Sequence, residues 1–315
     1  MPSSAEVAGV AITHPDRVVY GEPGITKLEL AEFYHQLSAR ILPHVEGRPL
    51  SVVRCPGGLE VGEPTRAVHQ SRGGRGDAKC FFQKHGNANT PGTIGRVPIR
   101  EAGKLAQYLS IDDEKGLITL IQFGAMELHP WGARADKPDA PDRMIFDLDP
   151  GPGVDWRAVV KAALAVKTRL ERLELESFVK TTGGKGLHVV VPLARRHDWS
   201  EVRDVSRAIA EAMAREEPER YVAQMALHLR PGKIFVDYLR NARGATAVAA
   251  YSTRARPGAT VAMPFSWDEI DRIDPASFNV RTLARRWARA RDPWKGFFQS
   301  TQRLPRGAMR AAANS

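Results

Sequence analysis

The chain has 315 residues, 43% of them hydrophobic and 26% charged, a composition typical of a globular protein with an apolar core. No apolar run approaches the roughly 20 residues that cross a bilayer, and the first residues lack the pattern of a secretory signal. The two cysteines, Cys55 and Cys80, are too few for a disulfide framework or a zinc site. We therefore expect a cytoplasmic protein, associated with the nucleoid and not with a membrane.

The net charge of +10 favours polyanionic partners such as nucleic acid or nucleotides, although a basic protein can also be merely soluble. Basic residues are concentrated between Arg281 and Arg310, where Asp292 is the single acid. Such a segment follows a phosphate backbone or forms a solvated face, and composition leaves both open.

The N-terminal half predicts a small α/β module. Short strands are expected within residues 1–20, and Thr26 to Glu29 has the form of a helix capping box. The helix behind it is expected to end at Pro43. Further along, a basic, glycine-rich loop is expected at 56–79, and strands at 50–54 and 116–123; for the latter, a short helix is the less favoured alternative.

A Pro/Asp-rich linker at 135–142 predicts a module boundary, after which the pattern becomes regular. We expect strands and helices in the order β-α-β-β-α-β, which favours an α+β sandwich like the ferredoxin or RNA-recognition folds. The expected strands cover residues 144–149, 178–181, 187–192, 233–239 and 246–251, the expected helices cover 155–175 and 200–215, and a basic C-terminal helix closes the chain.

Asp147 and Asp149 are the sharpest local signal. On a strand, residues i and i+2 point to the same face, so the two carboxylates project together. Like charges so close are stabilised by a cation, and hard oxygen ligands select Mg²⁺ or Mn²⁺. Two solvated acids at a strand end are the ordinary alternative.

Residues 181–188, TTGGKGLH, form a second signal between two apolar strands. The glycines allow backbone N–H groups to converge on an anion, while Thr182, Lys185 and His188 add polar or charged groups suited to a triphosphate. The Walker spacing and its following helix are absent, and a plain hairpin turn is the alternative.

Asp237 lies in an otherwise apolar strand, where an unpaired buried carboxylate is costly. Arg230, Arg240, Arg254 and Arg256 surround that strand in sequence and suit phosphate binding, or are simply solvated. Together, the three acids, the glycine loop and the arginines predict a two-metal phosphoryl-transfer site that extends a primer with nucleotides.

The motifs FDLDPG, GGKGLH and VDYLRN, in this order and spacing, resemble the polymerase domain of bacterial DNA ligase D, within the archaeo-eukaryotic primase superfamily. The resemblance covers roughly residues 7–300. It implies an RNA-recognition-like catalytic module, an antiparallel sheet with helices, packed on a smaller N-terminal α/β module. It places the N-terminal module at about 1–135, the catalytic module at about 140–260 and a C-terminal helical segment at about 266–300. We expect residues 301–315 to form a basic, disordered tail.

The resemblance also implies residue roles. It implies two Mn²⁺ or Mg²⁺ ions on Asp147, Asp149 and Asp237, and a nucleoside triphosphate bound by His129, Thr182, Lys185, His188, Arg240, Arg254 and Arg256. It implies that Arg17 and Lys27 bind the 5′-phosphate of a downstream strand, that Phe81 and Phe82 stack on template bases, and that Arg54, Lys84 and Arg230 contact DNA. Thr182 stands where the family has serine, and His14 where some relatives have asparagine, which puts the latter contact in doubt.

We therefore expect a metal-dependent, DNA-directed nucleotidyltransferase that extends primer ends at breaks or gaps in bacterial non-homologous end joining, with ribonucleotides preferred. The implied partners are primer-template DNA, DNA ends with a 5′-phosphate, Ku, and a DNA ligase in cis or in trans. An aspartyl-phosphate phosphatase is one alternative, but Pro150 and Gly151 follow Asp149 where that mechanism usually has Thr or Val. A non-catalytic DNA-end-binding module is the other.

Overall fold

The chain passes repeatedly between two structural units in the computed structural model, which describes residues 4–59, 80–101, 103–286 and 291–313. The first unit contains residues 1–130, 248–262 and 276–290, and the second contains 131–247, 263–275 and 291–315. Residues 248–262, which we expected in the catalytic module, thus belong to the first unit. The strand expected at 246–251 is wrong. The chain passes from the second unit to the first within this segment, and its only bridge there, among the described residues, is the isolated one between Thr246 and Trp131.

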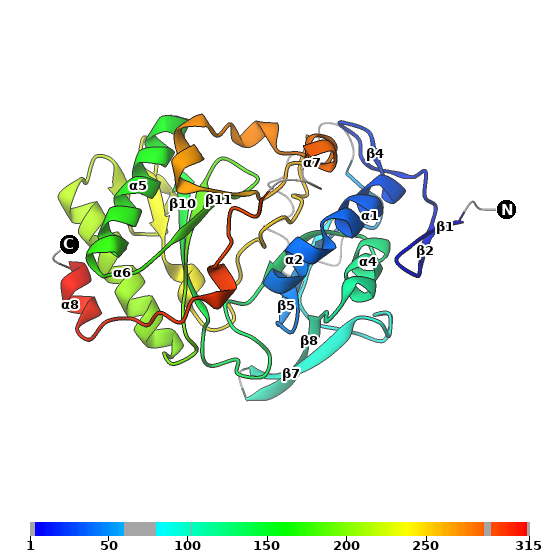
Figure 1. Cartoon of the computed structure of the whole chain (residues 1–315), viewed down its shortest axis with the longest axis horizontal. Helices are drawn as coiled ribbons and strands as arrows, with labels where there is room; N and C mark the ends of the chain where they lie inside the picture. Colours follow the sequence, from blue (N-terminus) through cyan, green and yellow to red (C-terminus); the bar gives the residue numbers. More distant parts are fainter. Residues whose placement is uncertain (1–3, 60–79, 102, 287–290, 314–315) are drawn as a thin grey trace. The chain divides into compact units, whose positions relative to one another are not determined.

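The first unit is built on a five-stranded antiparallel sheet in the order β6-β5-β8-β7, with β9 also paired to β5 (Figure 1). The helices α1, α2 and α4 pack against one another, and α2 and α4 also pack on β9. The elements are β1 (Ser4–Val7), β2 (Val10–Thr13), β3 (Val18–Tyr20), β4 (Ile25–Thr26), α1 (Lys27–Gln36), α2 (Ser38–Val45), β5 (Leu50–Arg54), β6 (Phe81–Gln83), β7 (Gly95–Glu101), β8 (Lys104–Ser110), α4 (Glu114–Gln122), β9 (Ala125–Pro130) and α7 (Val280–Arg286).

Helix α1 begins as the sequence predicts and ends earlier. The Thr26 hydroxyl accepts a hydrogen bond from the Glu29 amide, and the Glu29 carboxylate accepts one from the Thr26 amide, which completes the capping box. The helix ends at Leu37, and a second helix, α2, starts at once and contains Pro43. Pro43 therefore does not end the predicted helix, because the break falls six residues before it.

Residues 114–122 form a helix, so the strand predicted at 116–123 is wrong. The side chain of Asp113 accepts a hydrogen bond from the Gly116 amide and caps helix α4 at its N-terminus. Six consecutive residues of this helix, from Gly116 to Ile121, are buried. A run that is apolar on every side carries no period, so its pattern does not separate a buried helix from a buried strand.

Cys55 and Cys80 form a disulfide that joins the end of β5 to the residue before β6. This pairing was not predicted, because the two cysteines are 25 residues apart and nothing in the sequence relates them. The register of the two strands places them together: Arg54 lies opposite Phe81, so the next residues outward are the two cysteines. The glycine-rich loop predicted at 56–79 lies mostly outside the described residues.

The second unit is built on a six-stranded sheet in the order β13-β14-β10-β12-β11-β15. The predicted strands at 144–149, 178–181, 187–192 and 233–239 and both predicted helices are confirmed, with slightly different ends. The elements are β10 (Arg143–Pro150), α5 (Trp156–Arg172), β11 (Phe178–Thr181), β12 (Leu187–Pro192), α6 (Trp199–Glu216), β13 (Tyr221–Val222), η1 (Leu227–Leu229), β14 (Ile234–Asp237), η2 (Leu239–Asn241), β15 (Pro264–Phe265), η3 (Trp267–Arg272), η4 (Pro275–Ser277), η5 (Phe297–Gln299) and α8 (Ala308–Ala313).

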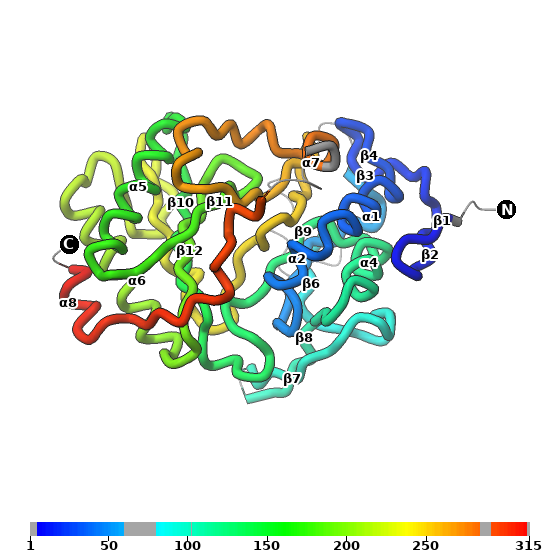
Figure 2. The backbone as a smooth tube through the Cα atoms, viewed as in Figure 1, coloured from blue at the N-terminus to red at the C-terminus, as the bar shows by residue number. Residues whose placement is uncertain are grey.

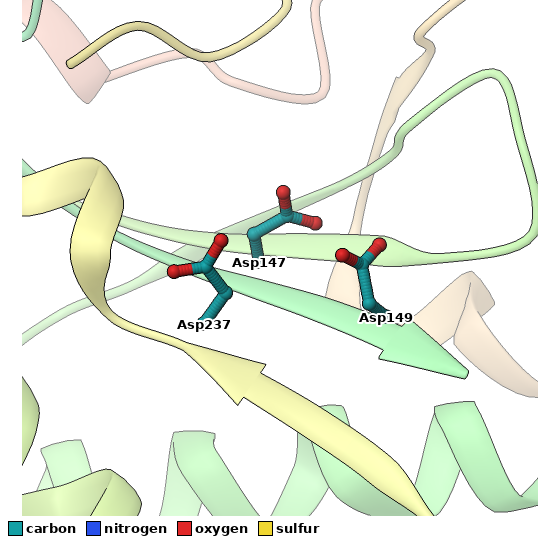
Figure 3. A group of neighbouring side chains, drawn as sticks. All are labelled: Asp147, Asp149 and Asp237. Carbon is teal, nitrogen blue, oxygen red and sulfur yellow. The ribbon is translucent and has the colours of Figure 1, made fainter. Parts of the chain in front are cut away.

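The two faces of this sheet differ because side chains alternate along each strand. Met144, Phe146 and Leu148 of β10 are fully buried and share one core cluster with residues of α5 and α6. The intervening residues, including Asp147 and Asp149, therefore point to the opposite face, away from the helices (Figure 3). The helices thus cover one face of the sheet, and the carboxylates lie on the other.

The C-terminal segment is ordered where we expected a disordered tail. Helix α8 packs on α6, and the two run side by side in the tube view (Figure 2). Ala308 and Ala312 are buried in the core cluster of the second unit. Small apolar residues at helical spacing explain the packing, which composition alone does not reveal. Among the described residues, no helix has the length and apolarity needed to cross a membrane.

We predict that Gly151→Ala destabilises the second unit. A Cβ atom at this position would lie 1.8 Å from the carbonyl oxygen of Arg230, so the backbone of one segment must move. Such a strain costs about 1–3 kcal/mol, measured as the free energy of unfolding by urea denaturation. Gly92→Ala is the control, because a Cβ atom there has no neighbour within 4 Å. Equal stability of the two variants would contradict the close approach at Gly151.

Candidate active site

Three carboxylates meet on the open face of the six-stranded sheet. One carboxylate oxygen from each of Asp147, Asp149 and Asp237 lies within 4.8 Å of the others (Figure 3). Asp147 and Asp149 lie on β10, and Asp237 is directly opposite Asp147 on the antiparallel strand β14. The predicted pair and the isolated third acid are therefore brought together by strand register.

The register also extends this row of polar residues across the sheet. Asp147 lies between Asp237 on β14 and His188 on β12, and His188 in turn lies opposite Lys180 on β11. Nε2 of His188 is 3.3 Å from Oδ1 of Asp147. All four residues are buried, so their charges interact through protein more than through water.

Arg240 compensates two of the three carboxylates. Its Nε atom lies 3.2 Å from Oδ2 of Asp147 and 3.2 Å from Oδ2 of Asp237. The neighbouring Asn241 holds this turn in place, because its side-chain oxygen accepts from the Ile145 amide and its side-chain nitrogen donates to the Ile145 carbonyl. The motif VDYLRN thus supplies an acid, a cation and the amide that fixes them to β10.

Asp149 is the least compensated acid. Its ion-pair partner is Arg230, whose Nη1 atom is 4.0 Å from Oδ2 of Asp149 and whose guanidinium lies over the ring of Phe235. Burial and the neighbouring charge of Asp147 raise the pKa of Asp149 to about 7. Burial also raises the pKa of Asp237, although Arg240 opposes this.

Asp147 is held ionised despite its burial. Burial raises its pKa, but the neighbouring His188 and Arg240 lower it well below the usual range of an aspartate. Conversely, burial and the charge of Lys180 lower the pKa of His188 to about 4, against the attraction of Asp147. A cluster with one firmly ionised carboxylate and two that resist ionisation fits a divalent cation, because hard oxygen donors bind it and its charge would favour all three in the ionised form.

The glycine-rich loop is tied together by Thr182. The Thr182 hydroxyl accepts hydrogen bonds from the amides of Gly184 and Gly186 and donates to the carbonyl of Gly186. The predicted convergence of backbone amides is present, but two of them point to this hydroxyl within the loop. Lys185, at the tip, is exposed. Gly186 approaches β10 so closely that a Cβ atom would lie 2.4 Å from the Leu148 carbonyl oxygen.

His129, Arg254 and Arg256, which we also predicted to bind nucleotide, lie in the first unit. Glu127 of β9 joins two of them: its Oε2 atom is 2.8 Å from Nε2 of His129 and 3.0 Å from Nε of Arg254. Arg256 is half-buried, and burial followed by the nearby charge of Arg254 lowers its pKa.

Arg17 and Lys27 line one pocket of about 270 Å³ in the first unit, together with His14 and Arg54. Nζ of Lys27 donates to the Thr13 carbonyl at 3.1 Å, and Nη1 of Arg17 donates to the Pro56 carbonyl at 3.2 Å. Burial, and to a lesser extent Arg17, lowers the pKa of Lys27 to about 8. The sequence grouped the first two residues, and the structure adds Arg54 to the same pocket.

Of the other residues predicted to contact DNA, Phe81, Phe82 and Lys84 lie on β6 or directly after it, whereas Arg230 lies beside Asp149 in the second unit. The ring of Phe82 is 40% exposed and meets the His129 ring edge-on, with centroids 5.5 Å apart. Phe81 lies 5.2 Å from the Arg54 guanidinium, which also stacks on Phe123 and donates to its carbonyl. Lys84 is paired with Glu101 at 2.7 Å, so it is less available to a phosphate than the sequence suggested.

Two buried charged residues next to these groups were missed from sequence. Lys180 precedes the TTGGKG loop and belongs to the polar row of the sheet, and Glu127 precedes His129 by two residues on the same strand. The i, i+2 spacing of Glu127 and His129 was a usable signal, because it puts both side chains on one face of a strand. Lys180 offered none, since a single lysine in an apolar strand has many explanations.

The second unit therefore presents three carboxylates, two of them buried and that of Asp149 partly exposed, with an arginine across two antiparallel strands. This is the donor set of metal-assisted phosphoryl-transfer enzymes. The comparisons agree with this class. Residues 26–294 match the family model of the LigD primase-polymerase domain. The multifunctional non-homologous end joining protein LigD of Pseudomonas aeruginosa is 40% identical over 306 residues, which is 96% of this chain and 34% of that protein.

Other relatives give the same assignment. LigD of Mycolicibacterium smegmatis is 32% identical over 86% of this chain and 34% of its own length. A solved structure, the polymerase domain of Mycobacterium tuberculosis ligase D in complex with DNA, superposes on this chain with a TM-score of 0.80. The two chains are 29% identical, and the match covers 93% of this chain and 99% of the solved one. The chain belongs to the LigD primase-polymerase family and is a polymerase-type nucleotidyltransferase with a mixed α/β fold. It spans about a third of the length of these curated relatives.

We predict that Asp149→Asn stabilises the metal-free protein, and more so at high pH. The folded-state pKa of about 7 lies above the unfolded value of about 3.9, so the wild type loses stability as pH rises from about 4 to 7, whereas asparagine does not titrate. Because the side chain is 44% exposed, solvent screening limits the gain to roughly 1–2 kcal/mol above pH 7. Urea denaturation at pH 5 and pH 8, in the presence of a chelator, measures the difference in the free energy of unfolding between Asp149→Asn and the wild type. The same difference at both pH values would contradict the raised pKa.

Proposed function

We propose that this chain extends primer strands at DNA breaks or gaps in bacterial non-homologous end joining. One observation carries the proposal: the three carboxylates of Asp147, Asp149 and Asp237 meet on a sheet face of a chain that belongs to the LigD primase-polymerase family. The strand order β14-β10-β12-β11, with α5 and α6 on one face, supports the RNA-recognition-like interpretation of the catalytic module.

The three aspartates would hold two divalent cations, Mn²⁺ or Mg²⁺, which supply activation of a primer 3′-hydroxyl and neutralise the charge of the leaving pyrophosphate. In this proposal the chain's own residues prepare that site. Arg240 keeps Asp147 and Asp237 oriented towards each other, and His188 fixes Asp147 from the other side. The site is thereby organised before any substrate binds, which reduces the free energy spent on reorganisation.

For the nucleotide, we propose that Thr182, Lys185 and His188 act from the glycine loop and its strand, and that His129, Arg254 and Arg256 bind phosphate oxygens. Thr182 acts by shaping the loop, since its hydroxyl is used within it. Lys185 is exposed and so its charge is available to an incoming triphosphate. A preference for ribonucleotides is supported by family resemblance alone.

For the DNA, we propose that the basic pocket of Arg17 and Lys27 binds a downstream 5′-phosphate, and that Phe82 stacks on a template base. No acidic side chain is among the described residues that line this pocket, which favours an anion. Phe82 exposes an aromatic face beside the ring of His129, as base stacking requires. Arg54 and Arg230 would add phosphate contacts, Ku and a DNA ligase are the proposed partners, and the site of action is the cytoplasmic nucleoid.

We predict that Asp147→Ala abolishes primer extension and leaves binding of primer-template DNA within about twofold of wild type, because the carboxylate holds cations and not duplex. Extension of a labelled primer with Mn²⁺ or Mg²⁺ and each nucleotide type measures the polymerase activity. Fluorescence anisotropy measures the affinity for primer-template DNA. Asp139→Asn is the control, since it removes an exposed carboxylate of the same unit that pairs with Arg243. Extension by Asp147→Ala at the wild-type rate would refute the proposed site.

We predict that gapped DNA with a downstream 5′-phosphate binds more tightly than its hydroxyl counterpart at pH 7, by roughly 10- to 100-fold. The preference should fall as pH rises above about 8, because Lys27 is charged below its pKa of about 8 and neutral above it. Paired titrations at fixed salt from pH 7 to 9 measure the ratio.

The double variant Arg17→Ala/Lys27→Ala should remove this preference, whereas Lys104→Ala, which removes an exposed lysine of the same unit, should keep it. Equal affinity for the two DNA ends in the wild-type protein would show that the pocket does not recognise the 5′-phosphate.

A further inference from the structure

Glu127 is a buried carboxylate surrounded by groups that we propose bind the nucleotide. The residue is 2% exposed and lies on β9, two residues before His129. Its Oε2 atom accepts from Nε2 of His129 at 2.8 Å and lies 3.0 Å from Nε of Arg254. Its other oxygen, Oε1, accepts from the amide of Ala255 at 2.8 Å. One carboxylate therefore contacts a histidine, an arginine and the backbone between two arginines.

The segment that carries Arg254 and Arg256 is docked along the same strand. The Thr253 hydroxyl donates to the Met126 carbonyl at 2.6 Å, and the Leu128 amide donates to the Ser252 hydroxyl at 2.9 Å. These contacts fix residues 252 and 253 through the backbone of β9, on either side of Glu127. The segment beyond Thr253 is held by Glu127, through its side chain, at Ala255.

The groups around Glu127 favour its ionised form. Burial raises its pKa, but the charge of Arg254 and the hydrogen bond from His129 lower it well below the usual range of a glutamate. An ionised carboxylate buried in this way is stable only with its cationic partners in place, and those partners lose part of their own freedom in return. Arg254 is half-buried, with a side chain 16% exposed, so its orientation is set by this contact more than by solvent.

We propose that Glu127 is a positioning residue that holds His129, Arg254 and the turn leading to Arg256 in the arrangement that binds the triphosphate. The inference rests on the proposed nucleotide-binding role of His129 and Arg254, and it assigns Glu127 no contact with the substrate. A carboxylate among phosphate-binding groups would by itself repel the ligand; fixing the donors in advance outweighs this, because a flexible arginine would lose side-chain entropy on binding.

The test uses Glu127→Gln, which keeps the size of the side chain and an acceptor for the Ala255 amide but removes the charge. We expect the affinity for a fluorescent ATP analogue, measured without DNA and with Mn²⁺ present, to fall roughly tenfold. Competition by inorganic tripolyphosphate should weaken in parallel, and in primer extension KM for the nucleotide should rise more than kcat falls. The control is Glu114→Gln, which removes a carboxylate that contacts His35 at 2.7 Å in the same unit.

A double-mutant cycle separates positioning from general stability. Arg254→Ala should weaken nucleotide binding, and adding Glu127→Gln to it should cause less than a further twofold loss, since the residue to be positioned is gone. If Arg254→Ala and His129→Ala both leave nucleotide affinity unchanged, the proposed nucleotide role fails. If Arg254→Ala and His129→Ala weaken nucleotide binding but Glu127→Gln does not, the role of Glu127 is overturned and the nucleotide role stands. The same conclusion follows if Glu127→Gln weakens binding as much in the Arg254→Ala background as in the wild type. Thermal melting checks that each variant folds. If Glu127→Gln does not fold, the same nucleotide-binding measurements are made on Glu127→Asp, which keeps the charge but moves it away from His129 and Arg254.

Discussion

The burial of Asp147 in the central strand of its sheet is the constraint on which the catalytic unit depends. A buried carboxylate is costly unless its charge is compensated. Asp147 has a second carboxylate, Asp237, on one neighbouring strand and His188 on the other. One of these neighbours repels it and the other attracts it. Arg240 lies between the two aspartates and relieves the repulsion. Asp149 makes a longer contact, 4.0 Å to Arg230, and the attraction of Arg240 and Arg230 does not offset its burial and the charge of Asp147, so additional positive charge is favourable there.

Two further features hold the segments around that cluster in place. Asn241 attaches the turn that bears Arg240 to the backbone of β10 and so keeps this turn beside the aspartates. On the other side, Gly186 lets the TTGGKG loop approach β10 within a distance that any larger residue would prevent. Both contacts hold a segment against the backbone of β10, and so they keep the charged groups close enough to compensate one another.

The first unit uses the opposite arrangement, a single carboxylate among several cationic groups. Glu127 contacts His129 and Arg254, and the adjoining Ser252 and Thr253 bind the backbone of the same strand. The charge of Arg254 and the hydrogen bond from His129 hold the pKa of Glu127 well below its usual range, despite its burial. In the basic pocket of the same unit, Lys27 has a lowered pKa, and we expect its charge to vary within the working range of a DNA enzyme.

The sequence by itself determined the local elements and the chemical class of the site. The strand that carries Asp147 and Asp149, the glycine loop between two strands and the capping box at Thr26 each depend on neighbours along the chain. Each was confirmed as local structure, whereas the binding roles predicted for these residues stay predictions. Only the tertiary structure decided what depends on residues far apart. Strand register placed Asp237 and His188 beside Asp147 and paired Cys55 with Cys80. The structure also resolved residues 114–122 as a helix, which the pattern did not distinguish from a strand because residues 116–121 are buried, and packing on α6 ordered the C-terminal segment. The physical reason is the same throughout: a pattern along the chain records which face of an element is apolar, but compensation of a buried charge is settled by whichever partners the fold brings within a few ångströms.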